Sequence, residues 1–226
     1  MKESVIRLEN VWKVYQMGNI KVNALQGLNL DVKKGEFLAI MGPSGSGKST
    51  AVNMIGCLDV PTKGTIMLEH HDISKLSESE LAQIRGRKIG FIFQQFNLIN
   101  TLTALENITL PMIFQGTDKN QRLRTAEKLL SLVELSDRMY HKPTELSGGQ
   151  QQRVAIARSL ANDPEVILAD ELTGNLDSKT GEIVINFLEK LNKEGKTIIL
   201  VTHDANVAKH ANRVEYLKDG KIIKKR

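Results

Sequence analysis

Cysteine is nearly absent from this sequence, since Cys57 is the only one among 226 residues. A single cysteine excludes an intrachain disulfide, and with it the small secreted domains that depend on disulfides. Long hydrophobic runs are also missing. The longest, Phe37–Met41 and Ile198–Val201, have the length of strands and fall far short of the roughly 18–20 apolar residues of a membrane-spanning helix. These absences predict a soluble domain in a reducing, intracellular compartment.

Neither sign of charge dominates, since the chain has 31 Lys+Arg and 26 Asp+Glu and therefore a net charge of +5. This mild excess gives no argument for nucleic-acid binding, and we expect no nucleic-acid partner. The opening Met1–Ser4 does not lead into the apolar stretch of a signal peptide. The closing Lys224–Arg226 is interpreted as a solvated tail, because it is shorter than a usual polybasic membrane anchor. With 41% apolar residues the chain has the composition of an ordinary globular protein.

Two kinds of strand pattern are present. The first 35 or so residues alternate apolar and polar side chains, as at Leu28, Leu30 and Val32, which predicts antiparallel strands with one buried face. The later runs Phe37–Met41, Val166–Ala169 and Thr197–Val201 are almost wholly apolar, which is typical of parallel strands covered on both faces.

The last two apolar runs flank a predicted helix whose buried face is formed by Ile183, Val184, Phe187, Leu188 and Leu191. Strand, helix and strand in this order indicate a right-handed crossover in a parallel sheet. The dipeptide Asp219-Gly220 between short apolar runs of Val214–Ile223 predicts a hairpin.

The middle of the chain, from about residue 97 to 161, shows helical periodicity and no convincing strand. Leu123, Ala126, Leu129, Leu130 and Val133 form one stripe, and a second helix is predicted to begin after Ser147. Just before this region, Ser77 and Glu80 form a predicted capping box. We therefore expect a single α/β domain over residues 1–226, with a helical subdomain inserted at about 97–161.

A glycine-rich segment follows the strand Phe37–Met41 and matches the phosphate-binding pattern G-x-x-x-x-G-K-[ST] in full. Glycines let backbone N–H groups fold around phosphate oxygens, and the helix that follows adds the positive end of its dipole. Lys48 supplies a cation for the β- and γ-phosphates, and the hydroxyl of Ser49 is a ligand for Mg²⁺. The predicted nucleotide-binding residues here are Gly42, Pro43, Ser44, Gly45, Ser46, Gly47, Lys48, Ser49 and Thr50.

Two adjacent carboxylates, Asp170 and Glu171, end the buried strand Val166–Ala169. Ligands of open α/β sheets bind at the carboxyl ends of the strands, so both acids are expected to face the phosphate-binding loop. We predict that Asp170 holds the metal ion and that Glu171 orients or deprotonates the attacking water.

A third motif, Leu146-Ser147-Gly148-Gly149-Gln150, opens a helix inside the inserted region. Ser147 is a predicted N-cap, and the glycines allow a ligand to approach the backbone closely. The capped start of this helix is therefore a second candidate anion site.

With these motifs the whole chain resembles the nucleotide-binding subunit of an ATP-binding-cassette (ABC) transporter. Residues 42–49 correspond to the Walker A motif, Leu146–Gln150 to the LSGGQ signature, and Asp170 with Glu171 to the Walker B end. The resemblance implies an α/β fold: a P-loop NTPase core with an antiparallel β subdomain and an inserted α-helical subdomain. It also implies an ATPase whose cofactors are ATP and Mg²⁺.

Four weaker elements stand in the family's order. The resemblance implies that Tyr15 stacks on adenine, Gln94 touches Mg²⁺ as the Q-loop glutamine, Asp177 belongs to the D-loop, and His203 contacts the γ-phosphate. Taken singly, Tyr15 is more often a packing residue and His203 an ordinary turn residue. The three strong motifs favour the functional reading.

One departure from the family concerns the residue after the catalytic glutamate, which is Leu172 where the family has proline. Leucine keeps a backbone N–H and leaves φ free, whereas proline does neither. Glu171 itself is present, so we still expect hydrolysis.

The resemblance implies two partners. One is a second copy of the chain, because in the family the signature of one subunit, here Ser147, Gly148, Gly149 and Gln150, covers the ATP held by the other. The second is a separate integral-membrane permease subunit, which would keep the protein on the cytoplasmic face of the membrane. The segment Phe96–Ile99 is either its docking surface or internal packing.

The subfamily is indicated by Phe93–Leu98, Leu102–Asn107 and Gly56–Asp59, which resemble the lipoprotein-release and macrolide-export ATPases. A mechanical regulator of cell-wall or division machinery, coupled to a membrane partner without transport, is the alternative. A DNA-repair ATPase of the same family is disfavoured, since no sustained heptad repeat separates Lys48 from Asp170.

Overall fold

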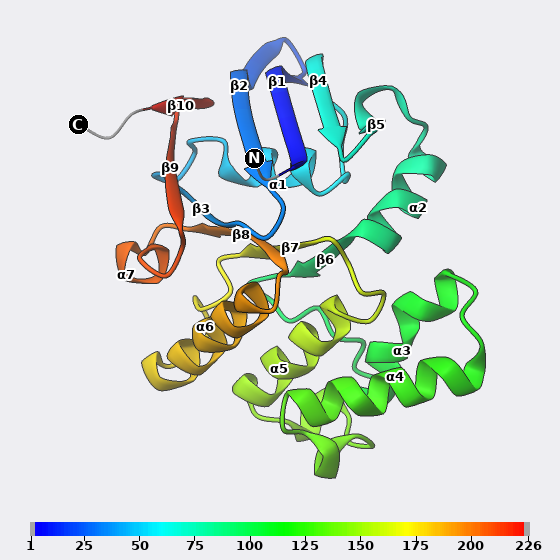
Figure 1. The fold of residues 1–226 in the computed structure, drawn as a ribbon. Helices are drawn as coiled ribbons and strands as arrows, with labels where there is room; N and C mark the ends of the chain where they lie inside the picture. Colours follow the sequence, from blue (N-terminus) through cyan, green and yellow to red (C-terminus); the bar gives the residue numbers. More distant parts are fainter. Residues whose placement is uncertain (1–2, 224–226) are drawn as a thin grey trace.

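A computed structural model describes residues 3–223, so the predicted basic tail at 224–226 lies outside the described part. Its strands form two sheets (Figure 1). The antiparallel sheet has the order β2-β1-β4-β5, and the core sheet has the order β10-β9-β3-β8-β7-β6. Strands β3 and β6 to β9 of the core sheet are parallel, and β10 returns antiparallel to β9.

The antiparallel sheet consists of β1 (Ser4–Met17), β2 (Ile20–Lys33), β4 (Lys63–Leu68) and β5 (His71–Asp72). The predicted antiparallel strands near the start of the chain are therefore confirmed, and Leu28, Leu30 and Val32 are buried as expected. Strand β4 was missed by the sequence analysis, because its first residues are polar and exposed and only its second half alternates.

The core sheet consists of β3 (Phe37–Met41), β6 (Ile89–Ile92), β7 (Val166–Asp170), β8 (Thr197–Thr202), β9 (Arg213–Lys218) and β10 (Lys221–Ile223). The three apolar runs that predicted buried parallel strands are confirmed as β3, β7 and β8. Strand β6 was missed, because a four-residue run is too short to give a pattern. The hairpin at Asp219-Gly220 is confirmed as the turn between β9 and β10.

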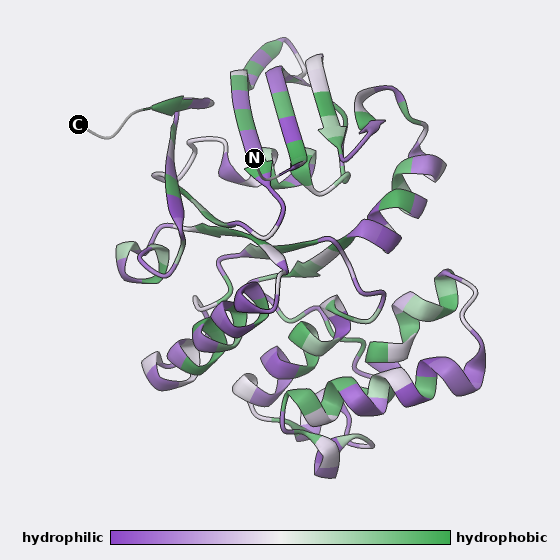
Figure 2. Cartoon of the chain, in the orientation of Figure 1, coloured by the Kyte–Doolittle hydropathy of each residue, from purple (hydrophilic) through white to green (hydrophobic). Residues whose placement is uncertain are grey.

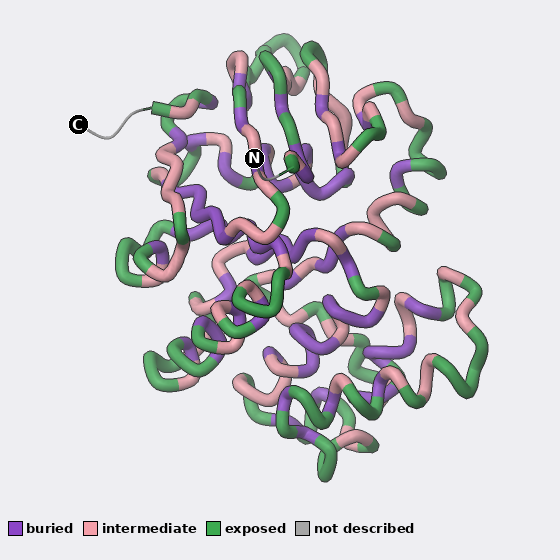
Figure 3. The backbone as a smooth tube through the Cα atoms, in the orientation of Figure 1, coloured by how far each residue is buried: buried purple, intermediate pink, exposed green. Residues whose placement is uncertain are grey.

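The core sheet is covered on both faces, so successive residues of one strand belong to different clusters. In β7, Val166 and Leu168 pack with α1 and the antiparallel sheet, whereas Ile167 and Ala169 pack with α5 and α6. This arrangement buries every residue of β3 and β8. Figure 3 shows the buried strands at the centre of the molecule, and Figure 2 shows their hydrophobic character.

The helices are α1 (Lys48–Ile55), α2 (Glu78–Lys88), α3 (Ala104–Phe114), α4 (Lys119–Leu132), α5 (Gly148–Ser159), α6 (Ser178–Lys193) and α7 (Ala205–Ala208). Single 3₁₀ turns lie at Ile73–Lys75, Ser136–Arg138 and Pro143–Glu145. The capping box of Ser77 and Glu80 begins α2 as predicted.

The described residues from 97 to 161 contain helices and turns and no strand, as expected, and α3, α4 and α5 share their own hydrophobic cluster. In α6 the predicted face is displaced. Ile183 is 52% exposed, and Ile185 is buried in its place beside Val184 and Leu188. The prediction was wrong at Ile183 because three consecutive β-branched residues give no periodicity of their own.

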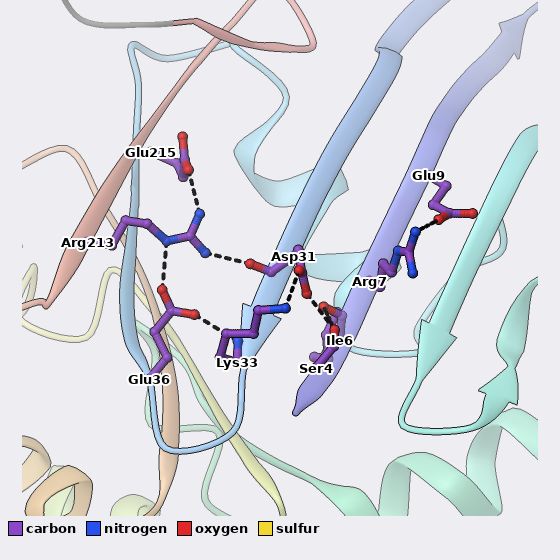
Figure 4. A network of polar contacts seen from close by, with 9 residues as sticks. All are labelled: Ser4, Ile6, Arg7, Glu9, Asp31, Lys33, Glu36, Arg213 and Glu215. Atoms are coloured by element: carbon purple, nitrogen blue, oxygen red, sulfur yellow. Dashed lines mark hydrogen bonds and ion pairs between the residues drawn. The ribbon is translucent and has the colours of Figure 1, made fainter. Parts of the chain in front are cut away.

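A polar network joins the two sheets (Figure 4). Arg213 of β9 donates to Glu36 and to Glu215, both at 2.6 Å, and to the carbonyl of Asp31 on β2. Glu36 also accepts from the backbone N–H of Lys33. The network fixes the end of β2 against the starts of β3 and β9, at the opposite end of β3 from the phosphate-binding loop.

Candidate functional site

The glycine-rich segment forms the turn between β3 and α1. Gly45 and Gly47 have φ of 74° and 101°, in the region that favours glycine. Gly47 is the N-cap of α1 and, as a glycine, has no side chain that could bond to the first N–H groups of that helix. These N–H groups lack partners within the helix and carry its positive dipole end, so they suit an anion.

Lys48 lies at the floor of this turn and is 9% exposed. Its ammonium group donates to the carbonyls of Gly42 at 2.7 Å and Pro43 at 2.9 Å. An ammonium has three N–H donors. Two therefore hold the loop in shape, and the third is available to a phosphate.

These groups open into one cavity of about 710 Å³, which is the size of a typical small-ligand site. It is lined by Val22, Asn23, Ala24, Ser44, Gly45, Gly47, Lys48, Ser49, Thr50, Gln94, Asp170, Glu171 and His203. The structure thus brings together predicted residues from the loop, from the end of β7, from the segment after β6 and from the end of β8. Gly42, Pro43 and Ser46 shape the loop from behind and do not line the cavity.

The two acids at the end of β7 have different surroundings. Burial, and after it the neighbouring charge of Glu171, raises the pKa of Asp170 above its ordinary value of 3.8, and the positive charge of Lys48 opposes this rise. Asp170 therefore gains from any cation that binds beside it. Glu171 has a φ of 45°, which is uncommon for a residue with a side chain.

Glu171 is held from two strands. Its backbone N–H donates to the carbonyl of Val201 on β8 at 2.9 Å, and its Oε1 lies 3.1 Å from Nδ1 of His203, just beyond the same strand. An ionised carboxylate only accepts hydrogen bonds, so Nδ1 carries the proton of this bond. Together the pair can orient a water and take up its proton.

The donor set fits Mg²⁺. Ser49, Gln94 and Asp170 supply a hydroxyl, an amide oxygen and a carboxylate to the same cavity, which is the oxygen chemistry that Mg²⁺ prefers. Within residues 3–223 there is no group of three or more His, Cys, Asp or Glu side chains that could hold a metal alone. A Mg²⁺ ion bound here would take its remaining ligands from phosphate oxygens and water.

The signature motif lies in a second cavity, of about 590 Å³, that shares no lining residue with the first. Ser147 caps α5, and its side chain and that of Gln150 form a reciprocal capping box. Gly148, Gly149 and Gln150 line this cavity together with Asn175, Leu176, Asp177 and Thr180. Asp177 caps α6, and the hydroxyl of Thr180 lowers its pKa.

Tyr15 does not line the nucleotide cavity among the described residues. Its hydroxyl donates to Asp59 at 3.2 Å, and the ammonium of Lys13 lies 5.1 Å from the centre of its ring. Burial is the main cause that raises its pKa, and a hydrogen bond with Thr50 opposes the rise. Through Thr50, Tyr15 is still connected to the start of α1.

Several residues at these cavities were not predicted. Val22, Asn23 and Ala24 of β2 form one wall of the first cavity, and Thr180 lies in the second. The side chain of Asn175, two residues before the predicted D-loop residue Asp177, donates to the carbonyl of Gln94 at 2.9 Å. None of these contacts has a sequence signal, because each joins segments far apart in the chain.

The sequence of this chain is similar to those of known proteins. The family model described as ABC transporter matches residues 25–174. An ABC transporter ATP-binding protein of Thermotoga maritima is 52% identical over 97% of this chain and 94% of its own length. The macrolide export ATP-binding/permease protein MacB of Brucella melitensis is 49% identical over 97% of this chain, which corresponds to 34% of that protein.

The fold of this chain is also similar to solved structures. A dimeric, post-hydrolysis structure of the ATP-binding cassette MJ0796 with ADP and Pi has a TM-score of 0.90 and 52% identity, over 98% of this chain and 97% of that one. A second dimeric structure of MJ0796, described as a bacterial ABC transporter cassette, has a TM-score of 0.89 and 54% identity, over 97% of each chain.

Proposed function

The chain belongs to the ABC transporter family, as an ATP-binding subunit that hydrolyses ATP, and from this premise we propose that two copies close around two ATP molecules and so drive a separate membrane subunit. Residues 1–226 act as one ATPase domain, into which the helical subdomain of about 97–161 is inserted. The relatives named for macrolide export support the export type rather than a mechanical regulator.

The observation that carries this proposal is the separation of the two cavities. Lys48, Asp170, Glu171 and His203 line the first cavity, and the signature residues line the second, with no residue in common. A triphosphate in the first cavity therefore has no signature from its own chain to cover it. A second copy, related by a two-fold axis, would supply the signature to each site, since such an interface uses the same surfaces twice.

The roles of the residues follow from their positions. The N–H groups of the loop and Lys48 hold the phosphates, and Ser49, Gln94 and Asp170 hold Mg²⁺, which when bound neutralises phosphate charge. Glu171 and His203 position the attacking water. Loss of the γ-phosphate removes what the signature of the other subunit binds, so the dimer opens.

No helix within residues 3–223 is long and apolar enough to cross a membrane. The proposed function therefore places the protein at the cytoplasmic face of a membrane through a separate permease subunit. Its docking surface would be the groove of about 360 Å³ between α2, α3 and α5, to which Phe93, Asn97 and Arg158 contribute. In the segment Phe96–Ile99, Leu98 packs into the helical cluster, whereas Ile99 is 42% exposed and is a residue of the segment that we propose for contact with the permease.

The concentration dependence of hydrolysis tests this function. If two chains form each site, the rate per chain should rise with protein concentration at low concentration and then level off, and it should require Mg²⁺. Lys48→Ala is the control and should remove the activity. A rate per chain that does not depend on concentration would contradict the shared site, and hydrolysis without a divalent cation would contradict the assigned metal ligands.

A further inference from the structure

The turn between β9 and β10 contacts the phosphate-binding loop from behind. The backbone N–H of Gly220 donates to the carbonyl of Ser46 at 2.9 Å, and the carbonyl of Gly220 accepts from the N–H of Gln26 on β2 at 2.9 Å. The side chain of Gln26 adds a third bond, to the carbonyl of Asp219, at 3.0 Å. One turn near the end of the chain thus ties β2 to the phosphate-binding loop, and Figure 1 shows β9 and β10 reaching toward β2.

The packing at this junction leaves no room for a side chain. A Cβ on Gly220 would lie 2.7 Å from the carbonyl oxygen of Ala24 and 3.0 Å from Cα of Leu25. A Cβ on Gly47 would lie 2.5 Å from the same carbonyl oxygen and 3.5 Å from Cα of Gly220. Backbone of three segments is therefore in direct contact, which is possible only because two of them carry glycine.

The turn's own conformation does not account for these contacts. Asp219 and Gly220 have φ of 49° and 72°, as a type I′ hairpin turn requires, and that turn accepts Asn as well as Gly. A hairpin alone needs neither the hydrogen bond to Ser46 nor the close approach to Ala24. The two contacts are made with two segments that form walls of the nucleotide cavity, the phosphate-binding loop and β2.

Two walls of that cavity meet at Gly220. Ala24 belongs to the wall formed by β2, and Gly47 belongs to the phosphate-binding loop, and both line the cavity whereas Gly220 does not. We propose that Gly220 is a positioning residue of the nucleotide site: its turn fixes the phosphate-binding loop against β2, and so sets the affinity for nucleoside phosphates without touching them. This inference rests on the proposed function of the cavity.

The substitution that isolates this role is Gly220→Asn. Asparagine tolerates a positive φ better than other residues with a side chain, so the turn is retained while a Cβ is added. That Cβ must push β2 away from the loop by several tenths of an ångström, and the N–H groups that hold phosphate move with the loop. We expect the Kd for ADP to rise at least tenfold.

A matched control is available at Gly116, which has a φ of 73° and no atom within 4 Å of the position of its Cβ. Gly116→Asn carries the same backbone strain far from the cavity, and it should bind ADP within twofold of the unaltered protein. ADP is the probe, because it lacks the γ-phosphate that would couple binding to dimerisation. Calorimetric titration gives the affinity, and thermal unfolding without nucleotide shows whether the two variants lose similar stability.

A second variant covers the case in which Gly220→Asn does not fold. Gln26→Ala removes only the bond to the carbonyl of Asp219, and it should weaken ADP binding two- to fivefold. The inference is overturned if Gly220→Asn binds ADP as tightly as Gly116→Asn, or, where it does not fold, if Gln26→Ala binds like the unaltered protein. If the unaltered protein and Gly116→Asn both fail to bind ADP, this result contradicts the proposed function of the cavity, on which the inference about Gly220 rests.

Discussion

Nδ1 of His203 lies 3.1 Å from Oε1 of Glu171, and the register of two parallel strands produces this contact. Asp170 on β7 is paired with Val201 on β8, so the residues that follow each strand leave the sheet side by side. The N–H of Glu171 then bonds to the carbonyl of Val201, which turns its side chain toward the end of β8. The acid and the imidazole are thus positioned by the sheet rather than by a flexible loop.

Replacing Glu171 by Gln removes the group that can accept a proton and keeps its size. We expect hydrolysis to fall by about 100-fold or more, the usual contribution of a general base, while ATP and Mg²⁺ still bind and hold the dimer closed. Phosphate release and gel filtration with ATP measure the two effects. Glu189→Gln is the control, because Glu189 also bonds to a histidine, His210 at 2.6 Å, outside the cavity. A Glu171→Gln protein that hydrolyses ATP at the normal rate, or that stays monomeric with ATP, would contradict the role of Glu171 as the general base of a shared site.

In the nucleotide-free protein, the ionised side chain of Asp170 should lower the free energy of unfolding at neutral pH. Burial raises its pKa above the ordinary 3.8, so the folded state holds the proton more tightly than the unfolded state. The ionised carboxylate therefore costs stability as the pH rises through the raised pKa, and this cost disappears below about pH 4.

Asp170→Asn is consequently expected to stabilise the nucleotide-free protein by about 0.5–2 kcal/mol at pH 7, the usual range of a single stabilising substitution. The difference should vanish in acid, and Mg²⁺-dependent hydrolysis should be lost. Urea unfolding at pH 4 and pH 7 provides the comparison. Equal free energies of unfolding of the two proteins at pH 7 would show that the surroundings of Asp170 do not disfavour its ionised form.

Leu172 occupies the position where the family has proline. It is 1% exposed, packs in the cluster between the core sheet, α5 and α6, and its carbonyl accepts from the side chain of Gln152 at 3.2 Å. Leu172→Pro keeps that carbonyl and fixes φ directly after Glu171.

We expect turnover to rise with little change in ATP affinity, at a cost in stability of about 1–3 kcal/mol from the lost packing. Steady-state kinetics and thermal unfolding separate the two effects. Leu188→Val, also fully buried in this cluster but remote from Glu171, controls for the loss of packing. Unchanged turnover in Leu172→Pro would mean that leucine does not limit the geometry of the Glu171 loop.

The sequence predicted those parts of the site that depend on local chemistry. The loop before Lys48 needs glycines for its φ values, and Ser147 is a residue type that caps helices, so each gives a signal within a few residues. The apolar runs of β3, β7 and β8 were predicted for the same reason, since strands covered on both faces have few polar positions.

The parts that were missed depend on pairing across the chain. Val22 to Ala24 reach the cavity only because β2 folds over the start of α1, and Tyr15 bonds to Asp59, which lies 44 positions away in the sequence. Strand β6 exists because β7 pairs with it rather than because of its own four residues. Such contacts are set by topology, which one sequence does not contain in its local pattern.

The network around Arg213 should contribute far more stability than a surface ion pair. Arg213 is 36% exposed and Glu36 is 13% exposed, and although burial opposes its charge, Glu36 and Glu215 raise the pKa of Arg213. Arg213→Met leaves two neighbouring carboxylates without their cation, so we expect a loss of about 1–3 kcal/mol in the free energy of unfolding. Arg7→Met is the control, since Arg7 and Glu9 pair along one strand, β1, at 59% and 49% exposure (Figure 4), and such exposed pairs contribute at most about 1 kcal/mol. Urea denaturation measures both, and equal losses would mean that the network does not join the two sheets energetically.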